Sequence, residues 1–467
     1  MSAVSTLTAL APTAPEVDAT RPLLPVVGGE LVVPTVTGAS VRYALLDYAA
    51  SAPSLQAVAD HVAAVLPYYS SVHRGAGFTS QVSTALYEGA RDTIGEFVGA
   101  RSDDVVVITR NTTDSLNLLA QSVPATANGT GEVVFLDVEH HANLLPWAAR
   151  GHRCVAAAPT VQATLSRLEA ELRRRPAALL AVTGCSNVTG EILPLRDLVR
   201  IAHLTGARVC IDAAQLAPHR RIDLAALGAD YLALSGHKLY APFGAGALIG
   251  RRDWLDEAPA YLAGGGAVRD VTVARAHWAP APQRHEAGSP NVLGAAALAA
   301  ACQALGSLPE GALEAHEAAL TARLLDGLAQ LPGVSPLQIW EDSTDRAGVV
   351  GFRVEGHDPA RVAAYLSAEH GIGVRDGRFC AHPLLSRLGT GDGALRASVG
   401  VGSRAEDVDR LVAALRTLLT TGESWTYAEV DGRWAPSPDT RPAPAFLGVP
   451  VLSGTPAAGA SPCEAGF

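Results

Sequence analysis

Two polar residues, Lys238 and Asp212, stand directly after apolar runs of this sequence. Lys238 follows Tyr231–Ser235 in the tetrapeptide Ser-Gly-His-Lys, and a lysine amine held beside a cofactor aldehyde can bond to it covalently. Asp212 ends the run Val209–Asp212, where a carboxylate can pair with a protonated ring nitrogen of a cofactor. Each residue by itself also has a simpler interpretation, a lysine that snorkels to solvent and an aspartate that caps a helix.

The elements that must position these residues are short apolar runs that alternate with helical stretches up to about residue 300. We expect strands at Tyr43–Asp47, Val105–Thr109, Val133–Asp137, Ala178–Thr183, Val209–Asp212, Tyr231–Ser235 and Ala245–Gly250. Strands this apolar, separated by helices, indicate an α/β fold with a mainly parallel sheet covered on both faces. Polar residues cluster after several of the runs, and ligands of such sheets bind at the carboxyl ends of the strands.

The pattern predicts two domains and two flanking segments. Residues 1–40 are expected to form an N-terminal arm, 41–305 a large domain and 306–420 a smaller α/β domain, to which the N-terminal segment is a candidate addition. The smaller domain should contain helices at Leu313–Leu331, Pro359–Glu369 and Ala405–Leu419 and strands at Gly348–Val354 and Leu395–Val399, and a buried helix is expected at Val292–Leu305. Residues 421–467 read as a hairpin-like extension around Asp431-Gly432, followed by a mobile tail.

Composition excludes several classes of protein. The chain of 467 residues has 48% hydrophobic and 18% charged residues and a net charge of −10, which is a globular composition without a nucleic-acid-binding surface. No apolar run is long enough for a membrane span, and the first twenty residues lack the features of a secretory signal. The six cysteines form no CxxC pair or disulfide framework. We therefore expect a cytoplasmic protein without a metal site.

Several motifs, in this order along the chain, together resemble one family. They are Leu46-Asp-Tyr-Ala-Ala-Ser-Ala52, Glu139-His-His-Ala-Asn143, Ser186-Asn187, Asp212-Ala-Ala-Gln215, Ser235-Gly-His-Lys238, Glu286-Ala-Gly-Ser-Pro-Asn291 and Val408-Asp-Arg-Leu411. The set strongly resembles the class V aminotransferase family of fold-type I pyridoxal-phosphate (PLP) enzymes, and within it the cysteine desulfurases and selenocysteine lyases. The resemblance implies a seven-stranded large domain, a smaller C-terminal domain and PLP as the cofactor.

The resemblance also implies roles for individual residues. Lys238 would carry PLP and move protons, Asp212 would hold the ring nitrogen, His140 would stack on the ring and Gln215 would donate to its phenolic oxygen. The phosphate would be held by Thr112, Thr113, Ser235 and His237, partly at a helix start. Ser289 matches a position that reaches the phosphate of the partner subunit, which implies a homodimer.

On the substrate side, Arg396 matches the arginine that grips the substrate carboxylate, a task that suits a planar guanidinium. Asn187 and His73 would line the same pocket, and Arg375 is a further candidate. The implied substrate is a small, cysteine-like amino acid, and a protein that accepts the sulfur is a further expected partner.

Cys380, in Gly377-Arg-Phe-Cys-Ala-His-Pro383, falls where the family has a nucleophilic cysteine. Its thiolate would attack the substrate sulfur, become a persulfide and release alanine. Three residues depart from the family pattern, because Arg378 and Phe379 stand where histidines are usual and Gly184 stands where a histidine is common. The cysteines at 154, 185, 210 and 302 are expected to be core residues.

The leading hypothesis is therefore a PLP-dependent cysteine desulfurase or selenocysteine lyase, a transferase or lyase of sulfur metabolism. The departures leave open a PLP-dependent C–S lyase that catalyses β-elimination, and a class V aminotransferase or epimerase that acts on another amino acid. A cofactor-binding scaffold without turnover is the non-enzyme alternative, and it is disfavoured by the intact set of Lys238, Asp212, His140 and Arg396.

Overall fold

The structure is a computed structural model that describes residues 17–73, 75–124, 131–430 and 432–447. The predicted tail beyond residue 447 and the first part of the predicted N-terminal arm lie outside the described residues. No helix of the described segments is long and apolar enough to span a bilayer.

The centre of the protein is a sheet of seven strands in the order β4-β10-β9-β8-β7-β5-β6. Its strands are β4 (Asp104–Thr109), β5 (Val133–Leu136), β6 (His152–Val155), β7 (Leu179–Thr183), β8 (Arg208–Asp212), β9 (Tyr231–Ser235) and β10 (Gly246–Arg251). Only β10 runs against the others, because it pairs antiparallel with both β9 and β4. The predicted mainly parallel, seven-stranded α/β architecture is confirmed.

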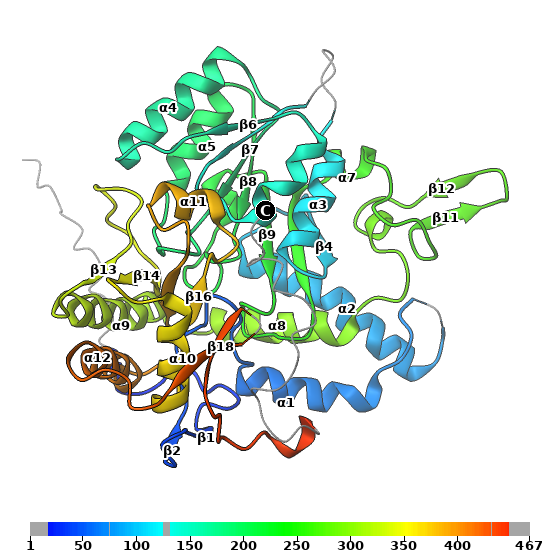
Figure 1. Cartoon of the computed structure of the whole chain (residues 1–467). Helices are drawn as coiled ribbons and strands as arrows, with labels where there is room; N and C mark the ends of the chain where they lie inside the picture. The colour runs from blue at the N-terminus through cyan, green and yellow to red at the C-terminus, as the bar shows by residue number, and fades with distance from the viewer. Residues whose placement is uncertain (1–16, 74, 125–130, 431, 448–467) are drawn as a thin grey trace, which may run out of the picture.

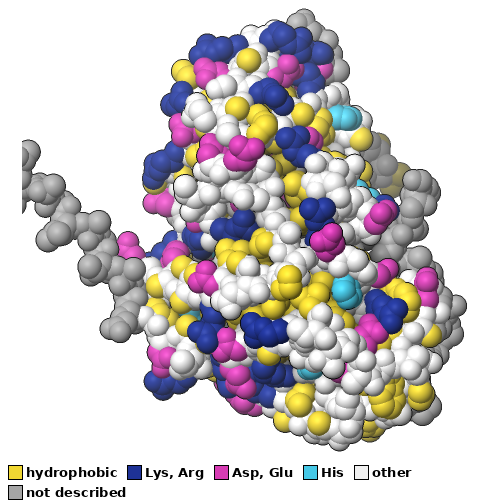
Figure 2. All heavy atoms as spheres, turned by 60° about the vertical axis from the view of Figure 1, so that its left-hand side comes forward, with side chains coloured by type: hydrophobic (Ala, Val, Ile, Leu, Met, Phe, Trp, Pro, Cys, Tyr) yellow, Lys and Arg dark blue, Asp and Glu magenta, His cyan; other side chains and the backbone are white. Residues whose placement is uncertain are grey.

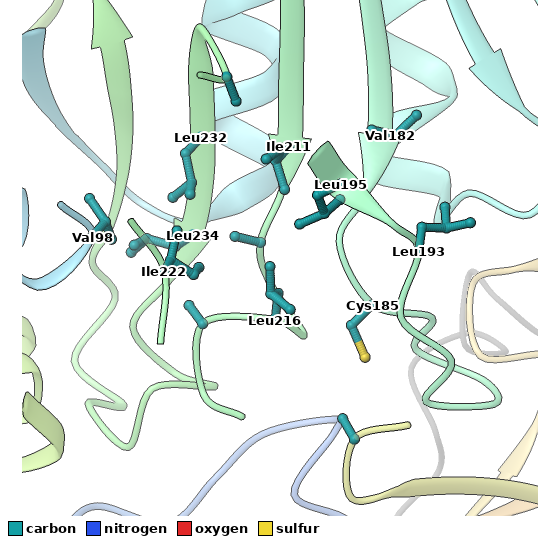
Figure 3. Packing of buried hydrophobic residues seen from close by; sticks show 14 of the residues in the cluster. Val98, Val182, Cys185, Leu193, Leu195, Ile211, Leu216, Ile222, Leu232 and Leu234 are labelled. Carbon is teal, nitrogen blue, oxygen red and sulfur yellow. The ribbon is translucent and has the colours of Figure 1, made fainter. Parts of the chain in front are cut away.

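Both faces of this sheet are buried, because alternate residues of one strand enter different cores. In β7, Leu180 and Val182 belong to the largest hydrophobic cluster, whereas Leu179 and Ala181 belong to another one on the opposite face. Figure 3 shows the first face, with Val182 of β7, Ile211 of β8 and Leu232 of β9 among the residues of this cluster. Helices α4 and α5 cover one side of the sheet and α3 and α7 the other (Figure 1).

The helices that surround the large sheet follow from its α/β alternation. They are α1 (Gln56–Val65), α2 (Phe78–Phe97), α3 (Thr112–Ser122), α4 (Val161–Arg174), α5 (Leu195–Leu204), α6 (Leu224–Leu227), α7 (Arg252–Glu257) and α8 (Val292–Gly306), with 3-10 turns η1 (Leu66–Tyr68), η2 (His141–Asn143), η3 (Leu145–Ala149) and η4 (Gln283–His285). The expected buried helix corresponds to α8, which packs against α1 and α2. A hairpin of β11 (Val268–Val271) and β12 (Ala276–Trp278) projects from the body (Figure 1).

A second sheet of four strands has the order β13-β14-β17-β16. Its strands are β13 (Val334–Pro336), β14 (Val349–Val354), β16 (Arg375–Gly377) and β17 (Ala394–Ser398), with helices α9 (Ala312–Ala329), α10 (Pro359–His370), α11 (His382–Arg387) and α12 (Ala405–Thr420). Strands β13, β14 and β17 and helices α9, α10 and α12 share a hydrophobic cluster of their own, which also includes Val36, Ala44 and Leu46 from the start of the chain. The buried residues of α11 belong instead to the largest cluster, beside the large sheet. The predicted domain boundaries stay a prediction.

Short two-stranded pairs complete the fold. They are β1 (Val32–Pro34) with β2 (Ser40–Arg42), β3 (Ala44–Leu45) with β15 (Ile372–Gly373), and β18 (Tyr427–Val430) with β19 (Arg433–Pro436), followed by the turn η5 (Ala445–Leu447). The strand expected at Tyr43–Asp47 is thus the short β3, and it pairs with β15 beside the second sheet rather than with the large sheet. Positive and negative side chains are interspersed over the face seen in Figure 2, so no single charge dominates it.

One prediction about the core is wrong. Cys154 was expected to be buried, but its side chain is exposed. The physical reason is its place in β6, which is the edge strand of the large sheet and was not among the predicted strands. Cys185, Cys210 and Cys302 are buried as expected.

Candidate active site

A cavity of about 280 Å³ lies at the carboxyl ends of β7, β8 and β9. Parallel strands place their carboxyl ends at one edge of a sheet, which is why residues far apart in sequence meet there. Of the sequence-predicted residues, it is lined by Thr112, Thr113, His140, Asn187, Asp212, Gln215, Ser235, His237, Lys238, Arg375, Cys380 and Arg396. His73 and Ser289 do not line it.

Lys238 and Asp212 form the floor of the cavity. Asp212 is the last residue of β8 and is buried, with one carboxylate oxygen accepting from the Ala214 N–H at 3.0 Å. Burial raises the pKa of Asp212. Lys238 is half-buried because it faces the cavity, and burial lowers the pKa of its amine to about 8 although Asp212 opposes that shift. A sizeable fraction of the Lys238 amine is therefore neutral near pH 8 and able to act as a nucleophile or base.

A cup of hydroxyls and N–H groups forms where α3 begins. Asn111 caps this helix by accepting from the Asp114 N–H at 3.0 Å. The Thr112 N–H and hydroxyl both lie 2.8 Å from the hydroxyl of Ser235, which ends β9. Burial lowers the pKa of His237 to about 4, so its imidazole is neutral and retains one N–H. Such a cup at a helix start suits the binding of a phosphate.

His140 and Gln215 line the same cavity as the floor residues. The His140 Nδ1 accepts from the Ala142 N–H at 3.0 Å, so the neutral ring carries its proton on Nε2. Burial and the nearby Lys238 lower the pKa of His140 to about 3. Gln215 donates through Nε2 to the Ala49 carbonyl, while its buried Oε1 has no hydrogen-bond partner among the described residues. Because buried polar atoms are nearly always hydrogen-bonded, an atom without a partner beside a cavity indicates a group that binds a ligand.

Arg396, in the middle of β17, is 3% exposed and places a positive charge in the wall of the cavity. Its Nη2 donates to Asp47 Oδ1 and its Nη1 to the Asn187 carbonyl, both at 2.9 Å. Burial lowers the pKa of this guanidinium, and Asp47 works against that shift. The Nε of Arg396 is buried and has no partner in the described part of the chain, whereas the residue itself lines the cavity. Arg375 lies opposite Arg396 on β16.

Cys380 lies on the loop between β16 and α11, at the wall of the same cavity. Cys380 and Phe379 both adopt positive φ angles, 52° and 53°, which non-glycine residues rarely do. The Phe379 carbonyl accepts from Asn187 Nδ2 at 2.8 Å, and the Cys380 carbonyl accepts from the His141 N–H at 2.9 Å. A T-shaped contact between the rings of His141 and His382, 4.4 Å apart, flanks the loop.

His73 and Ser289 lie apart from this cavity in the single chain. His73 lines a second cavity of about 420 Å³ together with Arg91, Glu286 and Gly288, and its imidazole pairs with Glu88 at 3.1 Å. Ser289 is exposed and follows Glu286, whose carboxylate pairs with the buried Arg91 at 2.5 Å. The roles predicted for His73 and Ser289 stay predictions.

The packing gives a reason for Gly184. A Cβ on this residue would lie 2.8 Å from Leu216 Cδ2 and 3.2 Å from Ile211 Cγ2. The position faces the hydrophobic core rather than the cavity, so a histidine would have to displace Leu216. This departure from the family pattern is a matter of core packing and does not alter the residues that line the cavity.

Three residues near the cavity were not assigned a role from the sequence. Asp47 forms an ion pair with Arg396. The one feature of the sequence that could have indicated a role is that this carboxylate ends an apolar run. Cys185 lines the cavity, and burial raises its pKa to about 12, so its thiol is inert. Glu139, directly before His140, is fully buried and accepts from Asn143 Nδ2 at 2.8 Å. Burial raises the pKa of Glu139 well above its usual range.

Comparison with known proteins agrees with this geometry. A cysteine desulfurase of Dickeya dadantii is 37% identical over 82% of this chain and 93% of its own length. A crystal structure of the Escherichia coli cysteine desulfurase CsdA, in an S-sulfonic acid form, is 33% identical with a TM-score of 0.72 and covers 81% of this chain and 96% of its own. The apo structure of a cysteine desulfurase from Thermococcus onnurineus is also 33% identical, with a TM-score of 0.74, and covers 81% and 94%.

The sequence profile described as Aminotransferase class-V matches residues 44–411. This range holds both sheets and every residue that lines the cavity at the strand ends. The match, the two similar structures and the lysine–aspartate floor at the strand ends agree with one another. The chain belongs to the class V aminotransferase family.

Proposed function

We propose that this protein is a PLP-dependent cysteine desulfurase, which removes sulfur, or selenium, from cysteine or selenocysteine and leaves alanine. One observation carries the proposal: Lys238, Arg396 and the thiol-bearing Cys380 line a single cavity. These are the three groups that the reaction needs, an amine to hold the cofactor and move protons, a cation to orient the substrate and a nucleophile to accept sulfur. The relatives named above, which span more than nine-tenths of their own length in the alignments, support it.

The residues present fit PLP. Lys238 would hold the aldehyde carbon, and the buried carboxylate of Asp212 would pair with the ring nitrogen. Gln215 still has a second amide hydrogen for the phenolic oxygen, and the neutral ring of His140 would lie against the cofactor ring. The phosphate would take the hydroxyl and N–H groups of Thr112, Thr113, Ser235 and His237. When bound, PLP supplies an electron sink for the bonds at the substrate Cα.

The residues of the chain then divide the remaining work. Arg396 orients the substrate through its carboxylate, since its guanidinium belongs to the wall of the cavity. The Lys238 amine, with its pKa lowered to about 8, takes and returns the proton at Cα. Asn187 helps by holding both the guanidinium of Arg396 and the carbonyl of Phe379.

Cys380 performs the sulfur transfer. Its thiolate attacks the substrate sulfur, so that a sulfur–sulfur bond forms while the substrate carbon–sulfur bond breaks. The electron pair of the broken bond stays with the substrate carbon, which gains a proton and becomes the methyl group of alanine. Cys380 is left as a persulfide, and a thiol of an acceptor molecule takes the outer sulfur in a later step.

The test is to incubate the purified protein with cysteine or selenocysteine and to measure alanine, pyruvate and sulfide separately. We expect alanine, together with a mass increase of one sulfur atom on Cys380. The Cys380→Ala variant should form no alanine from cysteine. The control variant Cys154→Ala, which changes an exposed cysteine on the edge strand β6, should behave as the parent. Pyruvate in place of alanine would identify a β-eliminating C–S lyase, and undiminished alanine from Cys380→Ala would refute the persulfide step.

We further propose that the enzyme works as a homodimer in the cytoplasm. Ser289 is exposed and does not line the cavity of its own chain, which fits a role at the phosphate of a partner subunit. None of the five described cysteines forms a disulfide bond, as is usual in a reducing compartment. Light scattering of the purified protein at the mass of one chain would exclude the dimer.

A further inference from the structure

We propose that Phe379 is a positioning residue that links the arginine of the substrate-carboxylate site, Arg396, to the loop that carries Cys380. The proposal rests on the function proposed above and extends it to a residue that stands where a histidine is usual in the subgroup that the chain resembles. A phenyl ring cannot exchange a proton, so its contribution must come from packing. The structure shows what it packs against.

Phe379, Arg396 and Asn187 form a closed circuit of contacts. The guanidinium carbon of Arg396 lies 5.1 Å from the centre of the Phe379 ring, within the range of a cation–π contact. Arg396 Nη1 donates to the Asn187 carbonyl at 2.9 Å, and Asn187 Nδ2 donates to the Phe379 carbonyl at 2.8 Å. All three residues are buried. Each member is therefore held by the other two, and little water is present to weaken the attraction.

The backbone of the loop needs such support. Phe379 and Cys380 are consecutive non-glycine residues with φ of 53° and 52°, and residues in this left-handed region persist only where their surroundings impose it. The imposing contacts come from distant segments, Asn187 at the Phe379 carbonyl and His141 at the Cys380 carbonyl. A third contact of the loop, between the Phe379 ring and Arg396, joins it directly to the cation that would bind the substrate.

The arrangement gives the circuit a consequence for catalysis. The guanidinium of Arg396 lines the cavity, and its bonds to Asp47 and Asn187 use only two of its five N–H donors. A substrate carboxylate that binds this guanidinium acts on the same group that the Phe379 ring covers. Arg396 thereby positions both the substrate, through its carboxylate, and the Cys380 loop, through the Phe379 ring. The thiol is therefore held in a constant position relative to the substrate.

The test measures the reactivity of Cys380 rather than turnover. In the holoenzyme without an amino acid, we would follow alkylation of Cys380 by iodoacetamide, located by mass spectrometry, in the parent, Phe379→Leu, Arg396→Lys and the double variant. Leucine keeps the site apolar but lacks the π face, so Phe379→Leu should alkylate at least about threefold faster as the loop loosens. The double variant should be no faster than the faster single variant, because both changes break the same contact.

Two further variants keep the test decisive. Phe379→Tyr retains the aromatic face and should alkylate at the parent's rate. If Phe379 only filled space, tyrosine would have no advantage over leucine. Phe379→Met, of similar volume, replaces Phe379→Leu if the latter fails to fold, as judged by circular dichroism. The proposal is overturned if Phe379→Leu, or Phe379→Met in its place, alkylates like the parent, or if its effect multiplies with that of Arg396→Lys.

The outcome is distinguishable from a failure of the proposed function. Alkylation reports the loop without any sulfur transfer, so a coupled Phe379–Arg396 pair in a protein that forms no alanine would refute the desulfurase function alone. Normal alanine formation with independent alkylation effects would refute the positioning role alone. In the parent background we also expect Phe379→Leu to lower kcat for alanine formation, since the thiol is misplaced after the substrate has bound.

Discussion

The cofactor floor and the cysteine loop face the same cavity but are built in different ways. Asp212 and Ser235 are the last residues of two central strands that are buried almost throughout, and Lys238 follows in the next turn. Cys380 lies on a loop with two positive φ angles, and its carbonyl and that of Phe379 are held by His141 and Asn187. The floor takes its geometry from the sheet, whereas the loop takes its geometry from contacts with other segments.

The difference teaches where tolerance and sensitivity should lie. A residue at the end of a buried strand is placed by the strand's whole ladder of hydrogen bonds, so one missing side chain leaves its neighbours where they are. A strained loop held by a few long-range contacts shifts when any one of them is lost. Changes in the floor should therefore remove chemistry without loosening structure, and changes around the loop should alter thiol reactivity without affecting the cofactor.

The largest effect is expected for Lys238→Ala. The variant should lose the absorbance band of covalently held PLP and at least about 10²-fold of its alanine formation, because in the proposed function the same amine binds the cofactor and moves the proton. Cys380→Ser should lose turnover but keep the band. The contrast between floor and loop would be broken if Cys380→Ser lost the cofactor as well.

The second effect concerns the pH at which cofactor-free protein captures PLP. Burial lowers the pKa of Lys238 to about 8, and the carboxylate of Asp212 opposes this shift. The other charged or titratable neighbours are Arg396, Cys380 and Cys185. Capture, followed by absorbance, should be half-maximal near pH 8 and fall about tenfold per pH unit below it. Asp212→Asn removes the charge that favours the protonated amine, so its midpoint should move to lower pH. A rate independent of pH would contradict the lowered pKa of the Lys238 amine.

A smaller effect is expected for His141→Ala on the loop side. His141 Nε2 accepts from the His382 N–H at 3.3 Å, and its loss should cost about 1 kcal/mol in the free energy of unfolding. Alkylation of Cys380 should rise while the PLP band stays unchanged. His277→Ala, at an exposed position of β12, is the matched control. Loss of the band in His141→Ala would show that floor and loop are not separable.

The smallest effect is expected for Glu139→Gln on the floor side. Burial raises the pKa of Glu139, so the folded protein keeps a proton that the unfolded chain releases above its ordinary pKa. The stability contributed by this proton is complete at low pH and is lost as the pH rises towards the folded-state pKa. Below about pH 4, where the glutamate is protonated in both states, the neutral glutamine should change the free energy of unfolding by less than about 0.5 kcal/mol. As the pH rises above the ordinary pKa of a glutamate, the variant should become the more stable protein in urea titrations. Destabilisation of the variant that grows with pH would show that Glu139 is ionised in the fold.

Local pattern predicted the large sheet and the floor well. The apolar runs that end at Asp212 and Ser235 are strands, because a run of buried side chains bounded by polar residues has few other solutions. The short β6, with His152 and Arg153 in it, was missed because an edge strand need not be apolar throughout. β3 was predicted, but its pairing with β15, more than 300 residues away, follows only from packing.

The sequence by itself determined the residue types at the strand ends and thereby the chemistry of Lys238 and Asp212, because the register of a parallel sheet brings those ends to one edge. Only the tertiary structure decided that Asp47 pairs with Arg396, that Gly184 faces the core and that Phe379 covers the guanidinium beside Cys380. The physical reason is distance along the chain. These contacts join segments up to about 350 residues apart, and their geometry depends on how two packed cores meet rather than on any local periodicity.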